Sequence, residues 1–265
     1  MGVDARPRIA DVELNLFGPG YGECCVLHMG DNRWVVIDSC IDSKSKRPAA
    51  LVYLDGLAVD VAECVELIVV THWHDDHIRG ISQVVAACPK AKICIPGALA
   101  NQELLASIII FDERHGLRAG SGVNELINVL ELCRKTHRPI KRAFSDTLLL
   151  KCNAADISHS RNTEIWSLSP SDLQVDEAIK AHRALVPTLN SAKRRAPERE
   201  PNHLSVVTII VLGETAVLLG ADLEETGNPG LGWSSIVSSS IRPQKKAIVF
   251  KVPHHGSRNG HLESV

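Results

Sequence analysis

The chain has 265 residues, of which 45% are hydrophobic and 4% aromatic, and its formal net charge is -2. This length and apolar content allow a sizeable buried core and favour a single domain over residues 1–265. The near-neutral charge excludes a basic field over the whole protein, and the few aromatic side chains argue against a broad base-stacking platform for single-stranded nucleic acid.

The eight cysteines show no paired spacing of a zinc ribbon, and no long apolar segment opens the chain. We therefore expect free thiols, mostly buried, in a cytoplasmic protein. No apolar run approaches the roughly 20 residues that cross a bilayer, so no membrane contact is expected.

The first half of the chain alternates strand-like and helical segments, which is typical of an α/β fold. Residues 30–32 form a hairpin turn between two apolar runs, and Pro89 ends the first helix. We expect strands at 11–17, 23–29, 33–38, 65–70, 92–95 and 148–152, and helices at 78–88 and 123–137.

The second half repeats the order of the first. We expect strands at 164–168, 204–212, 215–219 and 246–252, a helix at 172–185 and a charged surface loop at 191–200. In each half a hairpin and a strand end in side chains that can bind metals. This repetition predicts a pseudo-duplicated sandwich with one shared site.

The densest group of metal-binding side chains directly follows the strand at 65–70, and it consists of His72, His74, Asp76 and His77. Residues two apart in an extended segment project to the same side, so His72 and His74 can hold one ion together. Asp76 and His77 are displaced from that pair and can serve a second ion. The alternative is that Asp75 or Asp76 caps the following helix. Imidazole and carboxylate donors together favour zinc.

This motif resembles the His-x-His-x-Asp-His signature of the metallo-β-lactamase superfamily, whose fold is a four-layer αββα sandwich. The resemblance implies that Asp222 bridges two ions and that His203, 19 residues earlier, and His255 complete the ligands. Asn202 is the alternative to His203 at this ligand position. We favour His203, because imidazole is the better zinc ligand. Asp38, at a strand end, resembles the carboxylate that orients a ligand histidine.

Three segments are similar to the hydrolase domain of bacterial competence DNA-uptake channels: residues 20–23, 202–207 and 251–257. The last of them is the most specific. The chain ends ten residues after His255, which is earlier than expected for a complete second half, so a truncated C-terminal end is expected.

The resemblance implies a dinuclear metal-dependent hydrolase, most simply a phosphodiesterase or nuclease, whose nucleophile is a hydroxide shared by two divalent ions. Zinc is expected, with manganese as the alternative. One ion would be held by His72, His74 and His203 and the other by Asp76, His77 and His255, with Asp222 between them. Asp76 and His254 are the expected catalytic side chains, although His254 equally fits a supporting hydrogen bond.

The expected partner is a phosphodiester substrate, with nucleic acid as the first polymer to consider. Two other functions stay open on the sequence. One is hydrolysis of a lactam, lactone or thioester by the same centre, and the other is a metal-stabilised effector module of a larger assembly.

Overall fold

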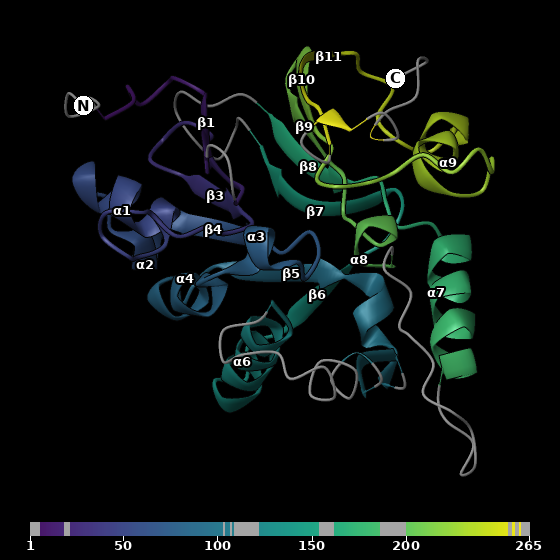
Figure 1. Cartoon of the computed structure of the whole chain (residues 1–265). Coiled ribbons are helices and arrows are strands. Elements are labelled where there is room, and N and C mark those ends of the chain that lie inside the picture. The colour runs from purple at the N-terminus through teal and green to yellow at the C-terminus, as the bar shows by residue number, and fades with distance from the viewer. Residues whose placement is uncertain are drawn as a thin grey trace. The chain divides into compact units, whose positions relative to one another are not determined.

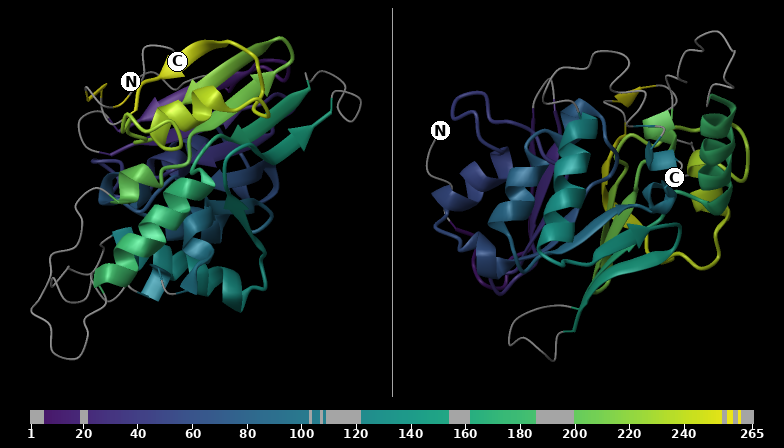
Figure 2. Two further views of the ribbon diagram at one scale, coloured as in Figure 1. Left: turned by 90° about the vertical axis from the view of Figure 1, so that its right-hand side faces the viewer. Right: turned by 90° about the horizontal axis from the view of Figure 1, so that it is seen from below.

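The structure is a computed structural model, and it describes residues 6–18, 22–102, 104–106, 108, 122–153, 162–185, 200–253, 256–257 and 260. Its strands form one six-stranded and one five-stranded sheet, each accompanied by helices (Figures 1 and 2). The predicted α/β class with two sheets is therefore confirmed.

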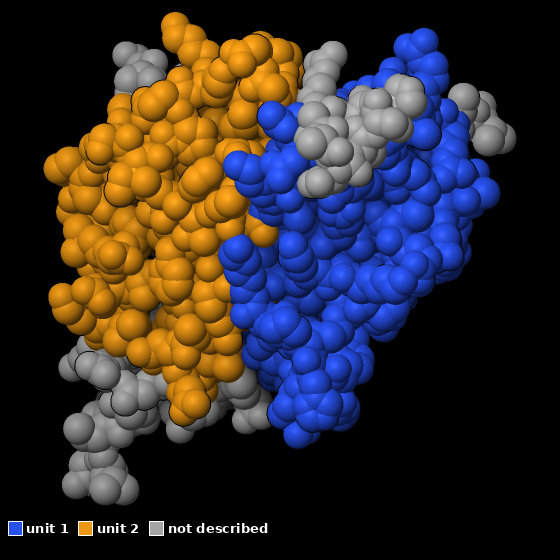
Figure 3. Space-filling view, turned by 180° about the vertical axis from the view of Figure 1, so that it is seen from behind, with its two compact units in different colours: residues 1–94, 118–141, 150–163 blue, residues 95–117, 142–149, 164–265 orange. Residues whose placement is uncertain are grey.

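The chain divides into two compact units, shown in different colours in Figure 3. Unit 1 comprises residues 1–94, 118–141 and 150–163, and unit 2 comprises residues 95–117, 142–149 and 164–265. Most of the six-stranded sheet belongs to unit 1 and most of the five-stranded sheet to unit 2. The single-domain interpretation stays a prediction.

The six-stranded sheet has the order β1-β2-β3-β4-β5-β6. Its first three strands form an antiparallel meander, and β4 and β5 then add in parallel to β3. Parallel neighbours need crossover connections, which helices supply here. The strands are β1 (Glu13–Phe17), β2 (Cys24–His28), β3 (Trp34–Ile37), β4 (Val65–Val69), β5 (Lys92–Pro96) and β6 (Ile140–Ala143).

The helices of unit 1 gather on one face of this sheet (Figures 1 and 2). They are α1 (Ala49–Gly56), α2 (Val61–Cys64), α3 (Asp75–Ile78), α4 (Ile81–Ala87) and α6 (Gly122–Lys135). Arg138 secures the end of α4, because its guanidinium donates to the carbonyl oxygens of Val85, Cys88 and Ala91 at 2.7–2.8 Å. The predicted helix at 78–88 is in fact α3 and α4, separated at Gly80, whose φ of +76° lies in the left-handed region.

The five-stranded sheet has the order β11-β10-β9-β8-β7. Its strands are β7 (Thr147–Cys152), β8 (Thr163–Ser167), β9 (Thr208–Leu212), β10 (Thr215–Leu219) and β11 (Ala247–Lys251). The described helices of unit 2 are η1 (Gly97–Ala100), α7 (Asp172–Leu185), α8 (Glu200–His203) and α9 (Gly232–Ser238). Trp233 and Ile236 of α9 pack into a core with Ile209 and Leu218, so α9 covers one face of this sheet.

The predicted repetition between the halves is visible in the strand pairing. In the first half β2 and β3 pair antiparallel, and β4 then pairs parallel to β3. In the second half β9 and β10 pair antiparallel, and β11 then pairs parallel to β10. Both parallel pairs begin with a register shift, after Trp34 and after Ala216. The two halves therefore share one local topology.

Two strand predictions were wrong in detail. The strand expected at 204–212 begins only at Thr208, because the backbone before it bonds elsewhere: the Val207 amide donates to the Ser169 hydroxyl at 2.8 Å. The strand expected at 246–252 is an apolar run, for which burial is the usual expectation, but it is largely exposed, with Ile248 at 71% and Val249 at 47%. The physical reason is that β11 is the edge strand of its sheet.

The eight cysteines are thiols, and all except Cys64 are buried, as predicted. Within the described residues, no helix is both long and apolar enough to span a lipid bilayer.

Candidate metal centre

The metal-binding motif lies where two parallel strands end. β3 and β4 are neighbours that run in the same direction, so their carboxyl ends share one edge of the sheet. Asp38 directly follows β3, and residues 71–77 follow β4. The Asp38 amide donates to Val69 and the Ser39 amide to His77, both at 2.8 Å. These backbone bonds fix the distance between the carboxylate and the histidines.

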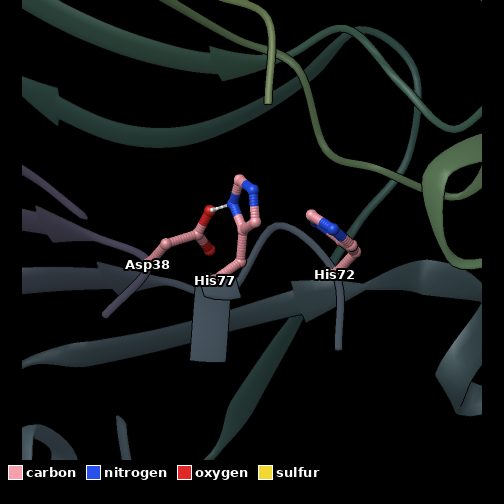
Figure 4. Close-up of side chains that lie close together, drawn as sticks. All are labelled: Asp38, His72 and His77. Carbon is pink, nitrogen blue, oxygen red and sulfur yellow. Dashed lines mark hydrogen bonds and ion pairs between the residues drawn. The ribbon is translucent and has the colours of Figure 1, made fainter. Parts of the chain in front are cut away.

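Asp38 is a buried carboxylate, 1% exposed, that organises the motif. Its Oδ1 accepts the Thr71 amide at 2.7 Å, and its Oδ2 accepts the Thr71 hydroxyl at 2.6 Å. Oδ2 also lies 2.8 Å from Nδ1 of His77 (Figure 4). Because a carboxylate only accepts, Nδ1 of His77 must carry a proton. Nε2 of the neutral ring is then the atom that can bind a metal.

The same carboxylate sets the tautomer of His72 through Thr71. The Thr71 hydroxyl has one proton, which it donates to Asp38, so it can only accept from the neighbouring Nδ1 of His72 at 3.0 Å. The neutral His72 ring is therefore also protonated at Nδ1 and offers a lone pair at Nε2. One carboxylate thus prepares two imidazoles as metal ligands, a pattern common around zinc.

The three histidines of the motif cluster. The ring centroids of His72 and His77 lie 4.3 Å apart, and those of His72 and His74 lie 4.9 Å apart. Donor atoms of Asp38, His72 and His77 lie within 4.8 Å of one another. Of these, we assign Asp38 to orientation, because its oxygens already accept three hydrogen bonds. The histidine donors fit a borderline divalent ion such as zinc.

Asp75 has a structural role. Its Oδ1 accepts the Gly122 amide at 2.6 Å, which ties the beginning of α6 to the motif, and its Oδ2 lies 3.3 Å from Arg79. A Cβ on Gly122 would lie 2.0 Å from the Trp73 carbonyl oxygen, so only glycine allows this approach. The aspartate therefore caps α6, rather than the helix that contains it.

Asp76 lies in the first turn of α3, and its carboxylate is not part of the group formed by Asp38, His72 and His77. Its carbonyl oxygen accepts the Glu23 amide at 2.7 Å. The Glu23 residue is 7% exposed. One of its carboxylate oxygens lies within 4.8 Å of a ring nitrogen of His77. Sequence reasoning missed Glu23 as a site residue, although the Gly22-Glu23 pair before β2 was a usable signal.

The charges at this edge affect a neighbouring thiol. Burial raises the pKa of Cys40 to about 11, and the negative charges of Glu23 and Asp38 add to the rise. Burial likewise raises the pKa of Cys24 well above its usual value. Both thiols therefore stay protonated at neutral pH.

In unit 2, Asp222 follows β10 and is 2% exposed. The turn that presents it contains Ala221 with a φ of +45°, and Nζ of Lys251 donates to the Ala221 carbonyl at 3.2 Å. Asp38 of unit 1 has a φ of +61° at the equivalent strand end. Both halves therefore place an aspartate at a tight turn after the second strand of a hairpin.

Asn202 and His203, the two candidates for one ligand position, share Glu224 as a neighbour. The Asn202 amide donates to the Glu224 carboxylate at 3.0 Å, and Nε2 of His203 lies 3.9 Å from it. Asn202 is buried, whereas the His203 side chain is 30% exposed. Glu224, 6% exposed, was not predicted, and its signal was a second carboxylate two residues after Asp222. His254 and His255 lie outside the described residues.

A sequence model of one protein family matches residues 17–142, and its description is the metallo-beta-lactamase superfamily. No curated protein matches the chain.

Several solved structures resemble the chain at low sequence identity. The metallo-beta-lactamase fold protein YhfI from Bacillus subtilis is 15% identical with a TM-score of 0.40, over 83% of this chain and 63% of that one. A metallo-beta-lactamase from Cronobacter sakazakii is 14% identical with a TM-score of 0.41, over 82% and 58%. A putative metallo-beta-lactamase from Thermotoga maritima is 12% identical with a TM-score of 0.41, over 80% and 78%.

The chain thus spans about three fifths of the length of the first two of these proteins. The matched residues 17–142 include Asp38, Glu23 and the whole histidine motif. The match covers just under half of the chain, and over that part the chain is similar to the metallo-beta-lactamase superfamily.

Proposed function

We propose that this protein is a metal-dependent hydrolase that cleaves phosphodiester bonds. The observation that carries metal dependence is the hydrogen-bond network of Asp38, which sets His72 and His77 in the tautomer that ligates through Nε2. A purely structural cluster would not need two buried imidazoles prepared by one carboxylate.

His72, His74 and His77 would hold the metal from unit 1. From the sequence resemblance we add Asp76, Asp222, His203 and His255 as further ligands. Together the seven residues would hold two ions. Bound divalent ions would supply a water acidic enough to attack at neutral pH and would neutralise charge on the substrate oxygens. The protein itself would orient the ligands. Asp38 and Thr71 restrict rotation of the His72 and His77 imidazoles, and burial shields their ring nitrogens from bulk solvent.

The substrate class rests on the resemblance of residues 20–23, 202–207 and 251–257 to the competence hydrolase domain. Phosphodiesters, with DNA or RNA first, are therefore the proposed substrates. Hydrolysis of a lactam is the second candidate, because the same donor set can activate water against a carbonyl carbon. The assays must separate the two.

The test begins with elemental analysis of the purified protein. Hydrolysis of bis(p-nitrophenyl) phosphate, a nicked plasmid and a single-stranded RNA is then compared with hydrolysis of a chromogenic lactam, with zinc and with manganese. We expect phosphodiester cleavage that a chelator abolishes and that His72→Asn and Asp222→Ala each reduce by at least about 100-fold. His137→Asn, which changes a histidine outside the motif, is the matched control.

Each contrary result has a definite meaning. Turnover of the lactam alone would replace the proposed substrate with the second candidate. Two bound ions without any turnover would favour the metal-stabilised effector module. Full activity of Asp222→Ala would refute the bridging role.

A further inference from the structure

Glu23 is held against the metal-binding motif by its own backbone. Its amide donates to the Asp76 carbonyl at 2.7 Å. The preceding Gly22 has a φ of +107°, and a Cβ there would lie 2.7 Å from Cβ of Cys40 and 3.3 Å from the Asp76 carbonyl oxygen. Only glycine lets the chain approach the first turn of α3 this closely. The position of Glu23 is therefore set by the motif itself.

The Glu23 side chain is directed into the protein. Only 7% of the residue is exposed, and a carboxylate oxygen lies within 4.8 Å of a ring nitrogen of His77, which is itself fully buried. Asp38 already holds Nδ1 of that ring at 2.8 Å. The folded chain thus places a second buried carboxylate beside an imidazole that the first one has oriented.

Two ligand atoms that each lie about 2.0–2.2 Å from a zinc ion are at most about 4.4 Å apart. The donor atoms of Glu23 and His77 lie no more than 4.8 Å apart, so at most a small side-chain rotation brings both of them to one ion.

We propose that Glu23 is a further carboxylate donor of the metal centre, binding a divalent ion together with His77. This inference rests on the proposed metal-dependent function and adds a residue outside the seven ligands that the resemblance implies. Glu23 would contribute to metal affinity directly, in contrast to Asp38, which acts by orienting the imidazoles.

The test compares Glu23→Gln and Glu23→Asp with the wild type, with Glu131→Gln as the control. Glu131 is an exposed residue of α6 in the same unit, so its variant repeats the chemical change away from the motif. Zinc affinity is measured by competition with a chromogenic chelator in the absence of substrate. Melting temperatures are measured with and without zinc.

We expect zinc to bind Glu23→Gln about 10- to 100-fold more weakly than the wild type, Glu23→Asp to fall between, and Glu131→Gln to be unchanged. The melting temperatures of Glu23→Gln with and without zinc give the second measure. The increase in melting temperature caused by zinc should be smaller than in the wild type.

Two results would overturn the inference. One is a zinc affinity of Glu23→Gln within about twofold of the wild type. The other is a lower melting temperature without metal together with an unchanged zinc effect, which would show a structural role only. Because no substrate is present, an inactive wild type that binds zinc would refute the phosphodiesterase proposal and leave this one intact.

Discussion

Replacement of Asp38 by asparagine tests the tautomer argument most directly. The carboxylate accepts three hydrogen bonds, from the Thr71 amide, the Thr71 hydroxyl and Nδ1 of His77, at 2.6–2.8 Å. Asparagine has one acceptor oxygen and one NH₂ group at these positions. Either the NH₂ group meets the Thr71 amide, donor against donor, or it faces Nδ1 of His77 and drives the proton to Nε2. The second arrangement removes the lone pair that binds metal.

We expect Asp38→Asn to bind zinc about 10- to 100-fold more weakly, which corresponds to about 1.4–2.7 kcal/mol. One buried donor or acceptor is left unmatched, so the metal-free protein should also lose about 1–3 kcal/mol of unfolding free energy. Chelator competition measures the affinity, and urea unfolding measures the stability.

Asp42→Asn is the matched control, because that half-buried carboxylate accepts the backbone amides of Lys44 and Ser45 in a turn outside the motif. If Asp38→Asn bound zinc within about twofold of the wild type, the tautomer argument would be refuted. A loss of stability without a loss of affinity would refute it as well.

The remaining predictions concern packing, thiol reactivity and pH. Gly122→Ala should lower the unfolding free energy, measured by urea unfolding, by about 1–3 kcal/mol, because its Cβ would lie 2.0 Å from a backbone carbonyl oxygen. Gly56→Ala is the control: a Cβ there has nothing within 4 Å, so the unfolding free energy should change by less than about 1 kcal/mol. The pKa of Cys40 is raised from 9.0 to about 11, so at pH 8 this residue should form about 100-fold less thiolate than an ordinary cysteine. Iodoacetamide should therefore label the less buried Cys64 before Cys40, which mass spectrometry of the peptides detects. Burial lowers the pKa of His28 below 6.5, so the stability from its neutral form is present above pH 6.5 and lost as the pH falls through the folded-state pKa. The difference in urea midpoint between pH 7.5 and 5.5 should shrink in His28→Gln, and an unchanged difference would contradict this assignment.

Much of the fold could be predicted from local sequence patterns. The strands β2, β3 and β4 are mostly apolar and buried, and the Gly213-Glu214 pair separates β9 from β10. Strand ends were informative because Asp38, His72 and Asp222 each lie within three residues of the end of an apolar strand. The repeated hairpin-and-strand order then suggested the pairing that both halves show.

Other elements could not be predicted because tertiary contacts stabilise them. The sequence of α9 is rich in serine and favours a helix only weakly. Its Trp233 is fully buried and donates to the Leu223 carbonyl at 3.0 Å, so packing holds the helix in place. The four-residue helix α2 depends on a cap, in which Asp60 accepts the Ala62 amide at 3.1 Å. Exposure of β11 follows from its place at the sheet edge, which apolar composition does not reveal.

The sequence by itself determined the donor types, their spacing after β4 and the strands that carry them, because hydrophobic periodicity and side-chain chemistry are local properties. Only the tertiary structure decided what those donors do. It placed Asp38, which follows β3, against Thr71 and His77, which follow β4, and so fixed which ring nitrogens carry protons. It also brought Glu23 beside His77 from 54 positions away. Such contacts depend on which strands become neighbours in the sheet, and chain spacing alone does not specify that.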